Sequence, residues 1–312
     1  EACAESGRCL RCDHFGYGIF KGVIDAAPEI DVASIEPSGY ATMVYDSKGN
    51  LTETLVKSGA NRLEASYEEL PQCLIDAFVA IEDSRFWSHK GVDVRSMVRA
   101  AVGIITGDSS AGGGSTLTQQ LIKNNIFEGG NEDTFGEKLE RKIQEQYLAI
   151  QLEKIMDKKI ILKNYLNTIN LGNNTLGVKA AALRYFDKDV SDLTLSEATV
   201  IAGITQNPSR FNPLSENGRK RNEEKRRVIL QYMYEQGMIT TKEYEDFRYN
   251  RIQVHFAKPV YGDDYGYIDG TLGEDGDPLD ALVMIPNSVF PGCVVECRAV
   301  GLYHMVDEAG GD

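Results

Sequence analysis

A glycine-rich stretch at residues 112–124, GGGSTLTQQLIKN, combines residue types that suit an anionic ligand. Its three glycines lack the Cβ atom that keeps a backbone away from a bound group. Ser115 and Thr116 follow at an expected helix start, where a hydroxyl can cap the helix or bind an anion. The same helix then carries two amides and one ammonium group, on Gln119, Gln120 and Lys123. The order of these residues excludes a Walker loop, and it predicts a phosphate or pyrophosphate site.

Two glutamates lie on predicted helices where a carboxylate needs a partner. A helix is expected from Pro71, with Glu82 on the same face as the apolar residues Ile75, Phe78, Val79 and Phe86. Glu145 lies on a later helical stretch, close to Arg141 and Lys142. Each glutamate leaves two interpretations open. It is either a capping or ion-paired residue, or a functional carboxylate that faces a cleft.

The elements that frame these residues are predicted to be helices, at 137–166, 178–185, 195–204 and from the basic run 219–227 to Gly237. The first of them is apolar nearly all round, so one or two central helices are expected there. The basic run is interpreted as a solvated helix face. Residues 40–56 alternate in polarity around a turn at 47–50, which predicts a β-hairpin.

Charge divides the 312 residues unevenly. From Val254 onward eleven acidic residues face two basic ones, a net of −9 out of the chain's −14, which leaves −5 for the 253 residues before. This change in composition predicts a domain boundary near residue 254. The acidic balance argues against nucleic-acid binding. No apolar run of about 18 residues is found, so no membrane span is expected in this chain.

Both ends of the chain carry candidate metal ligands. Near the C-terminus these are the aspartates Asp275, Asp277, Asp280, Asp307 and Asp312. Clustered carboxylates repel one another unless a hard cation lies among them, so a metal site is favoured over a solvated acidic loop. Near the N-terminus, Cys3, Cys9, Cys12 and His14 could bind zinc or an iron–sulfur cluster. There the usual second cysteine pair is missing, and a loose polar terminus is the favoured interpretation.

Residues 22–250 resemble the peptidoglycan glycosyltransferase domain of penicillin-binding proteins, glycosyltransferase family 51. Five motifs carry the resemblance in the order that the family has: EDSRFWSHKG (82–91), GGSTLTQQLIKN (113–124), RKIQE (141–145), KIILKNYLN (159–167) with Gly172, and KRRVIL (225–230). In the last motif, Lys225 stands where an arginine is common. Five motifs in one order make a coincidence implausible.

The resemblance implies a mainly α, lysozyme-like domain of two lobes with a small β-hairpin, which polymerises lipid II. In this inverting transfer the 4-hydroxyl of one lipid-linked disaccharide attacks the anomeric carbon of the growing chain, and undecaprenyl pyrophosphate leaves. The family pattern makes Glu82 the base. It places a second catalytic carboxylate, Glu145, around the diphosphate together with Lys123, Arg141 and Lys142. The substrate cleft would be lined by Ser115, Thr116, Gln119, Gln120 and Asn124.

Cofactor, partners and location follow from the same resemblance. Mg²⁺ or Mn²⁺ would assist the diphosphate without a dedicated protein cage. The partners would be lipid II and the growing glycan strand, at the extracytoplasmic face of a bacterial cell membrane. The apolar segments Met97–Ile105 and Leu121–Phe127 would form a wall that faces the membrane.

The two ends resemble other families. The sequence DYGYIDGTLGEDGDPLDALVMIP (264–286), with the five aspartates and Tyr265, is similar to soluble family I inorganic pyrophosphatase, a cytoplasmic enzyme whose aspartates hold Mg²⁺ ions. That family folds as a small closed OB-like β-barrel, and its earlier substrate-binding residues have no counterpart before Val254. A partial barrel without pyrophosphatase activity is therefore expected. The stretch CLRCDHFGYGIFKG (9–22) is similar to the tail of iron–sulfur-linked flavoprotein oxidoreductases.

The sequence thus predicts three parts, namely a cysteine-containing segment (1–21), a glycosyltransferase domain (22–253) and a pyrophosphatase-like fragment (254–312). Peptidoglycan glycosyltransferase is the leading function. The alternatives are a Mg²⁺-dependent inorganic pyrophosphatase fragment and a composite chain without activity. Loss of lipid II polymerisation in Glu82→Gln would support the first, and loss of Mg²⁺-dependent phosphate release in Asp277→Asn the second.

Overall fold

The computed structural model describes residues 21–249, except 38, 46, 49–50, 56–60, 108–112, 128, 131 and 133, and two short segments at 262–267 and 280–285. The chain divides into two compact units, Glu1–Phe256 and Ala257–Asp312.

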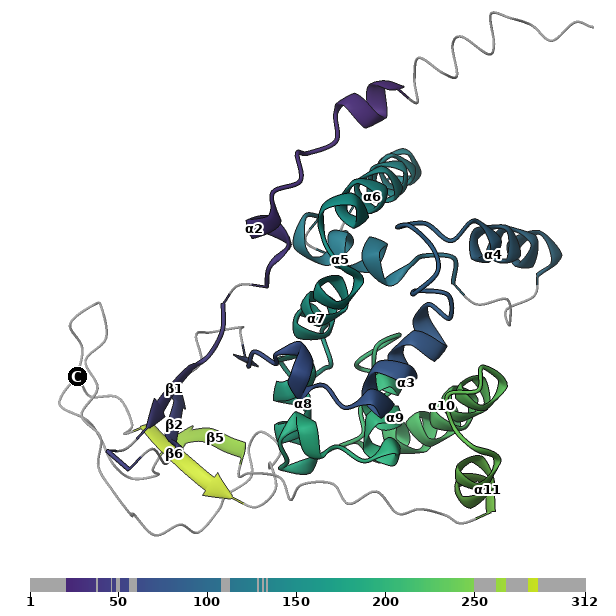
Figure 1. The fold of residues 1–312 in the computed structure, drawn as a ribbon. Coiled ribbons are helices and arrows are strands. Elements are labelled where there is room, and N and C mark those ends of the chain that lie inside the picture. The colour runs from purple at the N-terminus through teal and green to yellow at the C-terminus, as the bar shows by residue number, and fades with distance from the viewer. Residues whose placement is uncertain are drawn as a thin grey trace, which may run out of the picture. The chain divides into compact units, whose positions relative to one another are not determined.

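The first unit is mainly helical, as predicted (Figure 1). Its labelled helices are α2 (Val32–Ile35), α3 (Gln72–Glu82), α4 (Val94–Thr106), α5 (Leu117–Asn125), α6 (Phe135–Ile155), α7 (Lys158–Thr168), α8 (Val178–Phe186), α9 (Leu195–Ile204), α10 (Glu216–Glu235) and α11 (Thr241–Tyr249), with short 3₁₀ turns at η1 (Tyr67–Glu69) and η2 (Val190–Asp192). The stretch predicted as one or two helices is α6 followed by α7. The predicted helices at 178–185 and 195–204 are confirmed as α8 and α9.

Both units also contain short β-strands. The predicted hairpin is confirmed as β1 (Thr42–Tyr45) and β2 (Leu51–Leu55), which pair antiparallel with an irregularity between Val44 and Tyr45. Next, β3 (Asn61–Arg62) pairs parallel with β4 (Thr175–Leu176). In the second unit, β5 (Gly262–Tyr267) pairs antiparallel with β6 (Asp280–Ile285), from Gly262 opposite Ile285 to Tyr267 opposite Asp280.

Side-chain caps decide where several helices begin. Thr116, Thr134 and Thr194 each precede a helix and accept a hydrogen bond from the backbone N–H three residues on. In all three cases the side chain at that third position, Gln or Glu, accepts from the threonine N–H in return, which forms a capping box. The helix starts are therefore determined by local sequence.

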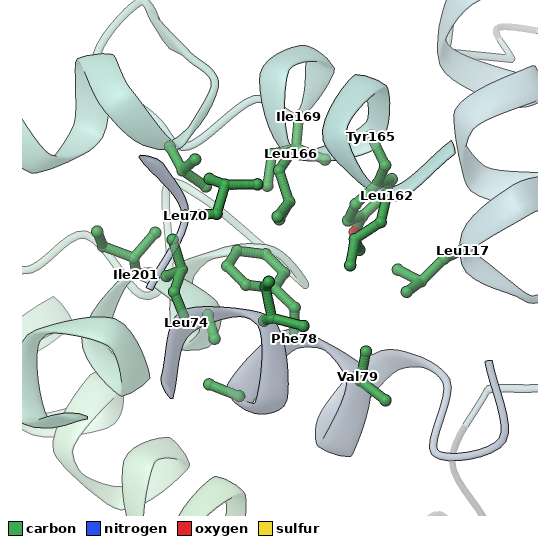
Figure 2. Packing of buried hydrophobic residues seen from close by; sticks show 14 of the residues in the cluster. Leu70, Leu74, Phe78, Val79, Leu117, Leu162, Tyr165, Leu166, Ile169 and Ile201 are labelled. Carbon is green, nitrogen blue, oxygen red and sulfur yellow. The ribbon is translucent and has the colours of Figure 1, made fainter. Parts of the chain in front are cut away.

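Figure 2 shows the centre of the core, where Leu70 and the α3 residues Leu74 and Phe78 face α7. The rings of Phe78 and Tyr165 meet edge to face, with their centroids 6.2 Å apart. Both side chains are fully buried, and truncation of such a buried aromatic ring to alanine costs about 3–5 kcal/mol. This packing holds the C-terminal end of α3, and with it Glu82, in a fixed position.

Two details of the predicted helices are wrong. The helix that carries Glu82 ends at that residue, because Asp83 leaves the helical conformation and uses its carboxylate elsewhere, so Phe86 is buried from the turn that follows. The helix α6 is not apolar all round. It buries the face of Leu148 and Leu152, whereas Leu139, Ile150 and Ile155 are exposed.

Candidate active site

Glu82, the last residue of α3, receives hydrogen bonds from two neutral side chains. Gln120 Nε2 on α5 donates to Oε2 at 2.9 Å. Thr205 Oγ1, directly after α9, donates to Oε1 at 2.7 Å. The carboxylate is half-buried. Its orientation is therefore set by groups that do not neutralise its charge, which suits a carboxylate that must accept a proton.

Gln120 and Lys225 extend the surroundings of Glu82. Gln120 Oε1 accepts a hydrogen bond from the Tyr165 hydroxyl at 3.2 Å. On α10, Lys225 Nζ donates to Gln206 Oε1 at 3.0 Å. Burial lowers the pKa of the Lys225 ammonium group, and the negative charge of Glu82 acts in the opposite direction. The basic run was interpreted as a solvated helix face; for Lys225 that interpretation is wrong, because its side chain is half-buried within reach of the Glu82 charge.

Thr116 and Gln119 are buried, and together they cap the N-terminus of α5. Thr116 N–H donates to Gln119 Oε1 at 3.0 Å, and Gln119 N–H donates to Thr116 Oγ1 at 3.2 Å. The Thr116 hydroxyl also donates to the Gly91 carbonyl at 2.7 Å. These contacts make both residues part of the scaffold at the start of α5, and the substrate contacts predicted for them stay a prediction.

Gly114 allows the loop that precedes α5 to lie against α4. A Cβ atom at this position would come within 3.2 Å of both Ala100 Cβ and Met97 Cα. Such a distance is tighter than ordinary carbon contacts, so a side chain here would push the loop away from the helix. The glycine run was predicted to lie close to a ligand, but at Gly114 its backbone lies close to α4.

A cluster of charged residues lies beside the start of α5. Glu145 on α6 is completely buried and forms ion pairs with Arg141 Nη1 and Lys142 Nζ, the latter at 2.6 Å. Lys142 Nζ also donates to Ser115 Oγ at 3.1 Å. Arg141 Nε lies 2.7 Å from Glu132 Oε1. The structure thus brings together three residues that the sequence assigned to the diphosphate, and it adds Glu132, which the sequence analysis missed.

Lys123 and Asn124 lie in the last turn of α5 and are half-buried. The charge of Lys123 contributes to lowering the pKa of the Glu132 carboxyl, after the larger effect of Arg141. Lys123 therefore belongs to the same electrostatic cluster. Because Gln120 and Lys123 are three residues apart on α5, they lie on neighbouring positions of one helix face.

Asp83 connects the turn after Glu82 to α5. Its Oδ2 atom accepts hydrogen bonds from Leu117 N–H at 3.0 Å and His89 Nε2 at 2.8 Å. Gly91 N–H donates to His89 Nδ1 at 3.2 Å, so the histidine proton lies on Nε2 in this arrangement. At Gly91, where φ is +89°, a Cβ atom would meet the Ala149 backbone of α6 at 2.5 Å. Sequence reasoning missed this network, because its partners are far apart in the chain.

A partly buried ion pair lies next to that histidine. Lys158 Nζ donates to Glu153 Oε1 at 2.8 Å and to His89 Nδ1 at 3.2 Å. Thr118 Oγ1 on α5 donates to the same Glu153 oxygen at 2.6 Å. Burial lowers the pKa of the Lys158 ammonium group, and the hydrogen bond to Glu153 opposes that shift. These contacts connect α5, α6 and α7 to one another near the site.

The predicted metal ligands are almost all outside the described residues. Of the C-terminal aspartates only Asp280 is described, as the first residue of β6, and the N-terminal cysteines and His14 are not described. Within the described residues no group of three or more His, Cys, Asp or Glu side chains is arranged to hold a metal ion. The carboxylates of the charged cluster are already paired with cations and do not fit a resident metal.

One of the two predicted membrane-facing segments is exposed and the other is not. On α4 the exposed side chains include Val94, Val98, Val102 and Ile105. In the second segment Leu121 and Ile122 are completely buried in the core, so that part of the prediction is wrong. Among the helices that the structure describes, none has the length and apolar character needed to cross a membrane.

The arrangement around α5 combines two features that suit group transfer. A carboxylate held by neutral donors can activate an acceptor, and a cluster of cations can stabilise an anionic leaving group. Residues 48–234, more than half of the chain, match the transglycosylase family model. The chain belongs to the transglycosylase family. Residues 232–312 match the family model described as inorganic pyrophosphatase.

Similar proteins carry the name penicillin-binding protein 1A. The one from Clostridium novyi (strain NT) is 39% identical over 234 residues, which is 73% of this chain and 27% of the relative. The one from Aquifex aeolicus (strain VF5) is 41% identical over 206 residues, 66% of this chain and 27% of the relative. The chain spans about a quarter to a third of the curated relatives it matches.

A crystal structure of penicillin-binding protein 1A from Haemophilus influenzae is 26% identical to this chain. The match covers 72% of this chain and 22% of that one, with a TM-score of 0.38.

Proposed function

We propose that residues 22–253 form a peptidoglycan glycosyltransferase that polymerises lipid II into glycan strands, with undecaprenyl pyrophosphate as the leaving group. One observation carries the proposal. In a chain of the transglycosylase family, Glu82 contacts α5 through Gln120, and Lys142 contacts Ser115, just before α5. A proton acceptor and a cationic cluster therefore flank one helix.

On the acceptor side, Glu82 takes the proton of the attacking 4-hydroxyl. Gln120 and Thr205 hold the two carboxylate oxygens in a fixed orientation. A base that is held in position before the reaction lowers the activation free energy of proton transfer. Such a general base typically increases the rate by about 10²–10⁴-fold. Lys225 lies close enough to interact with the charge of Glu82.

On the leaving-group side, Arg141 and Lys142 neutralise the diphosphate. Glu145 is completely buried between them, so we assign it a positioning role toward the two cations. A divalent cation would enter the site bound to the diphosphate oxygens, because the carboxylates of this cluster are paired with Arg141 and Lys142. No step is assigned to a protein-bound metal.

The exposed apolar side of α4 supports an enzyme that works at a membrane surface. Four of its exposed side chains, Val94, Val98, Val102 and Ile105, recur at intervals of four, four and three residues, and so follow one side of the helix. A lipid-linked substrate is presented at such a surface, which supports a location at the extracytoplasmic face of a bacterial membrane.

A second candidate function is Mg²⁺-dependent hydrolysis of inorganic pyrophosphate, which the family match of residues 232–312 favours. Loss of Mg²⁺-dependent phosphate release in Asp277→Asn would support it. The glycosyltransferase is preferred, because the transglycosylase family model matches more than half of the chain.

The test of the proposed function is polymerisation of lipid II by the whole chain and by Glu82→Gln. The glutamine is nearly the same size but cannot accept the proton, so the rate should fall by at least about 10²-fold. Circular dichroism should show an unchanged fold. A variant that polymerises at the original rate would exclude Glu82 as the base, and an inactive original chain would contradict the proposed function.

A further inference from the structure

We propose that Glu132 acts as an internal substitute for the diphosphate. Its carboxylate holds the Arg141 guanidinium in the free site, and an incoming diphosphate replaces it there. The inference rests on the proposed function, since it takes the diphosphate of the lipid-linked donor as the ligand.

The charges of the cluster show why a substitute matters. Arg141 lies between two carboxylates, Glu132 on its Nε side and Glu145 on its Nη1 side, and Lys142 pairs with Glu145. Together with Lys123, these side chains carry three positive and two negative charges, a net of +1. Displacement of the Glu132 carboxylate would raise the net charge that faces the ligand to +2, which would attract a diphosphate more strongly.

The geometry indicates which carboxylate is displaced. Both oxygens of Glu145 have cation partners, and its side chain is completely buried. Glu132 is one-fifth exposed, and its Oε1 lies 2.7 Å from Arg141 Nε. Among the described residues, Arg141 Nε and Glu132 Oε2 are buried atoms without a hydrogen-bond partner. A phosphate group offers several acceptor oxygens and can align with the guanidinium, so it can satisfy Nε better than Glu132 does.

Two glycines shortly before Glu132 bring the backbone close to Arg141. Gly129 and Gly130 have φ values of +86° and +76°, which glycine adopts without steric cost. A Cβ atom on Gly130 would lie 2.8 Å from Arg141 Cζ and Nε, so the backbone itself lies against the guanidinium. Gly130 therefore lies close against Arg141, next to the position that we propose a ligand takes from Glu132.

The test is the binding of inorganic pyrophosphate to the whole chain by calorimetry, without divalent metal. Glu132→Gln removes the competing charge, and the dissociation constant should fall roughly fivefold to tenfold. Glu216→Gln is the matched control, because it changes the net charge equally at an exposed ion pair on α10 and should leave binding unchanged. In an Arg141→Gln background, Glu132→Gln should have no effect, which assigns the change to this pair.

Equal or weaker pyrophosphate binding by Glu132→Gln would overturn the inference, since Glu132 would then only hold Arg141 in place. With lipid II as substrate, Glu132→Gln should show a lower KM, because the diphosphate of the substrate binds more tightly. It should also show a lower kcat, because the diphosphate product leaves more slowly. An unchanged KM would contradict the inference. Tighter pyrophosphate binding in a chain that cannot polymerise lipid II would remove the proposed function and leave the exchange at Arg141 intact.

Discussion

The two glutamates of the site have opposite surroundings, which separates their roles at the scale of single residues. Glu82 is half-buried and receives hydrogen bonds from two neutral side chains. Glu145 is completely buried and pairs with two cations. A change at Glu82 should therefore alter the reaction more than the fold. A change at Glu145 should alter both, because it leaves two neighbouring cations without their shared partner.

The prediction for Glu145→Gln is a loss of about 2 kcal/mol in the free energy of unfolding, together with loss of polymerisation. Breaking a fully buried ion pair costs more than this, but the partly exposed Lys142 is screened by water. Urea unfolding at pH 7 measures the change, and Glu82→Gln, expected to lose less than about 1 kcal/mol, is the control. Equal stability of the two variants would contradict the assigned difference between the glutamates.

Sequence could identify the charged members of this site but not how they are used. Glu82, Arg141 and Lys142 are recognisable because their types and motif order are visible in the chain. Thr205, Lys225 and Glu132 were missed as partners. Thr205 meets Glu82 across 123 positions of sequence, and nothing local marks such a pair. Local chemistry is also ambiguous: Thr116 and Gln119 have the groups of a binding site, and the same groups satisfy the backbone at the start of α5.

At the scale of elements, Asp93 joins the turn after Glu82 to α4. As the N-cap of α4, its carboxylate accepts from the N–H groups of Arg95 and Ser96 and from the Ser96 hydroxyl. It also accepts from Arg85 Nε at 2.9 Å. Burial alone would raise the pKa of the Asp93 carboxyl, but the bonds from Ser96 and Arg85 outweigh it and lower the pKa.

The prediction for Asp93→Asn is a loss of roughly 1–2 kcal/mol at pH 7, because asparagine can still cap the helix but cannot pair with Arg85. A carboxyl whose pKa is lowered by folding stabilises the protein above its unfolded value, near 4, and loses this contribution as the pH falls through the folded value. The gap between the original chain and the variant should thus stay constant from pH 7 to 5 and shrink below about pH 4. Urea unfolding at each pH measures it, and a constant gap at pH 3 would contradict the assignment.

The helices themselves were largely predictable, because their caps and their apolar spacing are local. α9 begins with a capping box and was predicted with its observed limits. The errors occurred where tertiary contacts decide. α3 ends at Glu82 because the Asp83 carboxylate is bonded to Leu117 and His89. α6 has two apolar stripes in sequence, and only contact with the core decides which one is buried.

At the scale of the whole molecule, the chain joins matches to two unrelated families. The transglycosylase match ends at residue 234 and the pyrophosphatase match begins at 232, within α10. The compact units divide later, after Phe256, so that α10 and α11 belong to the first unit. The change in charge near residue 254 lies close to this division. The limits predicted for the three parts remain predictions, and the helical unit contains every residue of the proposed glycosyltransferase site.

At the same scale, the exposed apolar side of α4 is the surface that we propose faces a membrane. Val98 and Ile105 on α4 are 58% and 85% exposed, and each would gain about 1.5–3 kcal/mol if it were buried in lipid. Val98→Ser together with Ile105→Ser should therefore weaken binding to neutral phosphatidylcholine vesicles at least about tenfold in co-sedimentation. Polymerisation of a soluble short-chain lipid II analogue should remain, because neither side chain contacts the charged cluster or Glu82. Leu183→Ser on α8, at a side chain 43% exposed, is the control and should bind vesicles normally. If the double variant kept full vesicle binding, α4 would not be the lipid-facing element, whereas loss of activity on the soluble analogue would show that α4 supports the site itself.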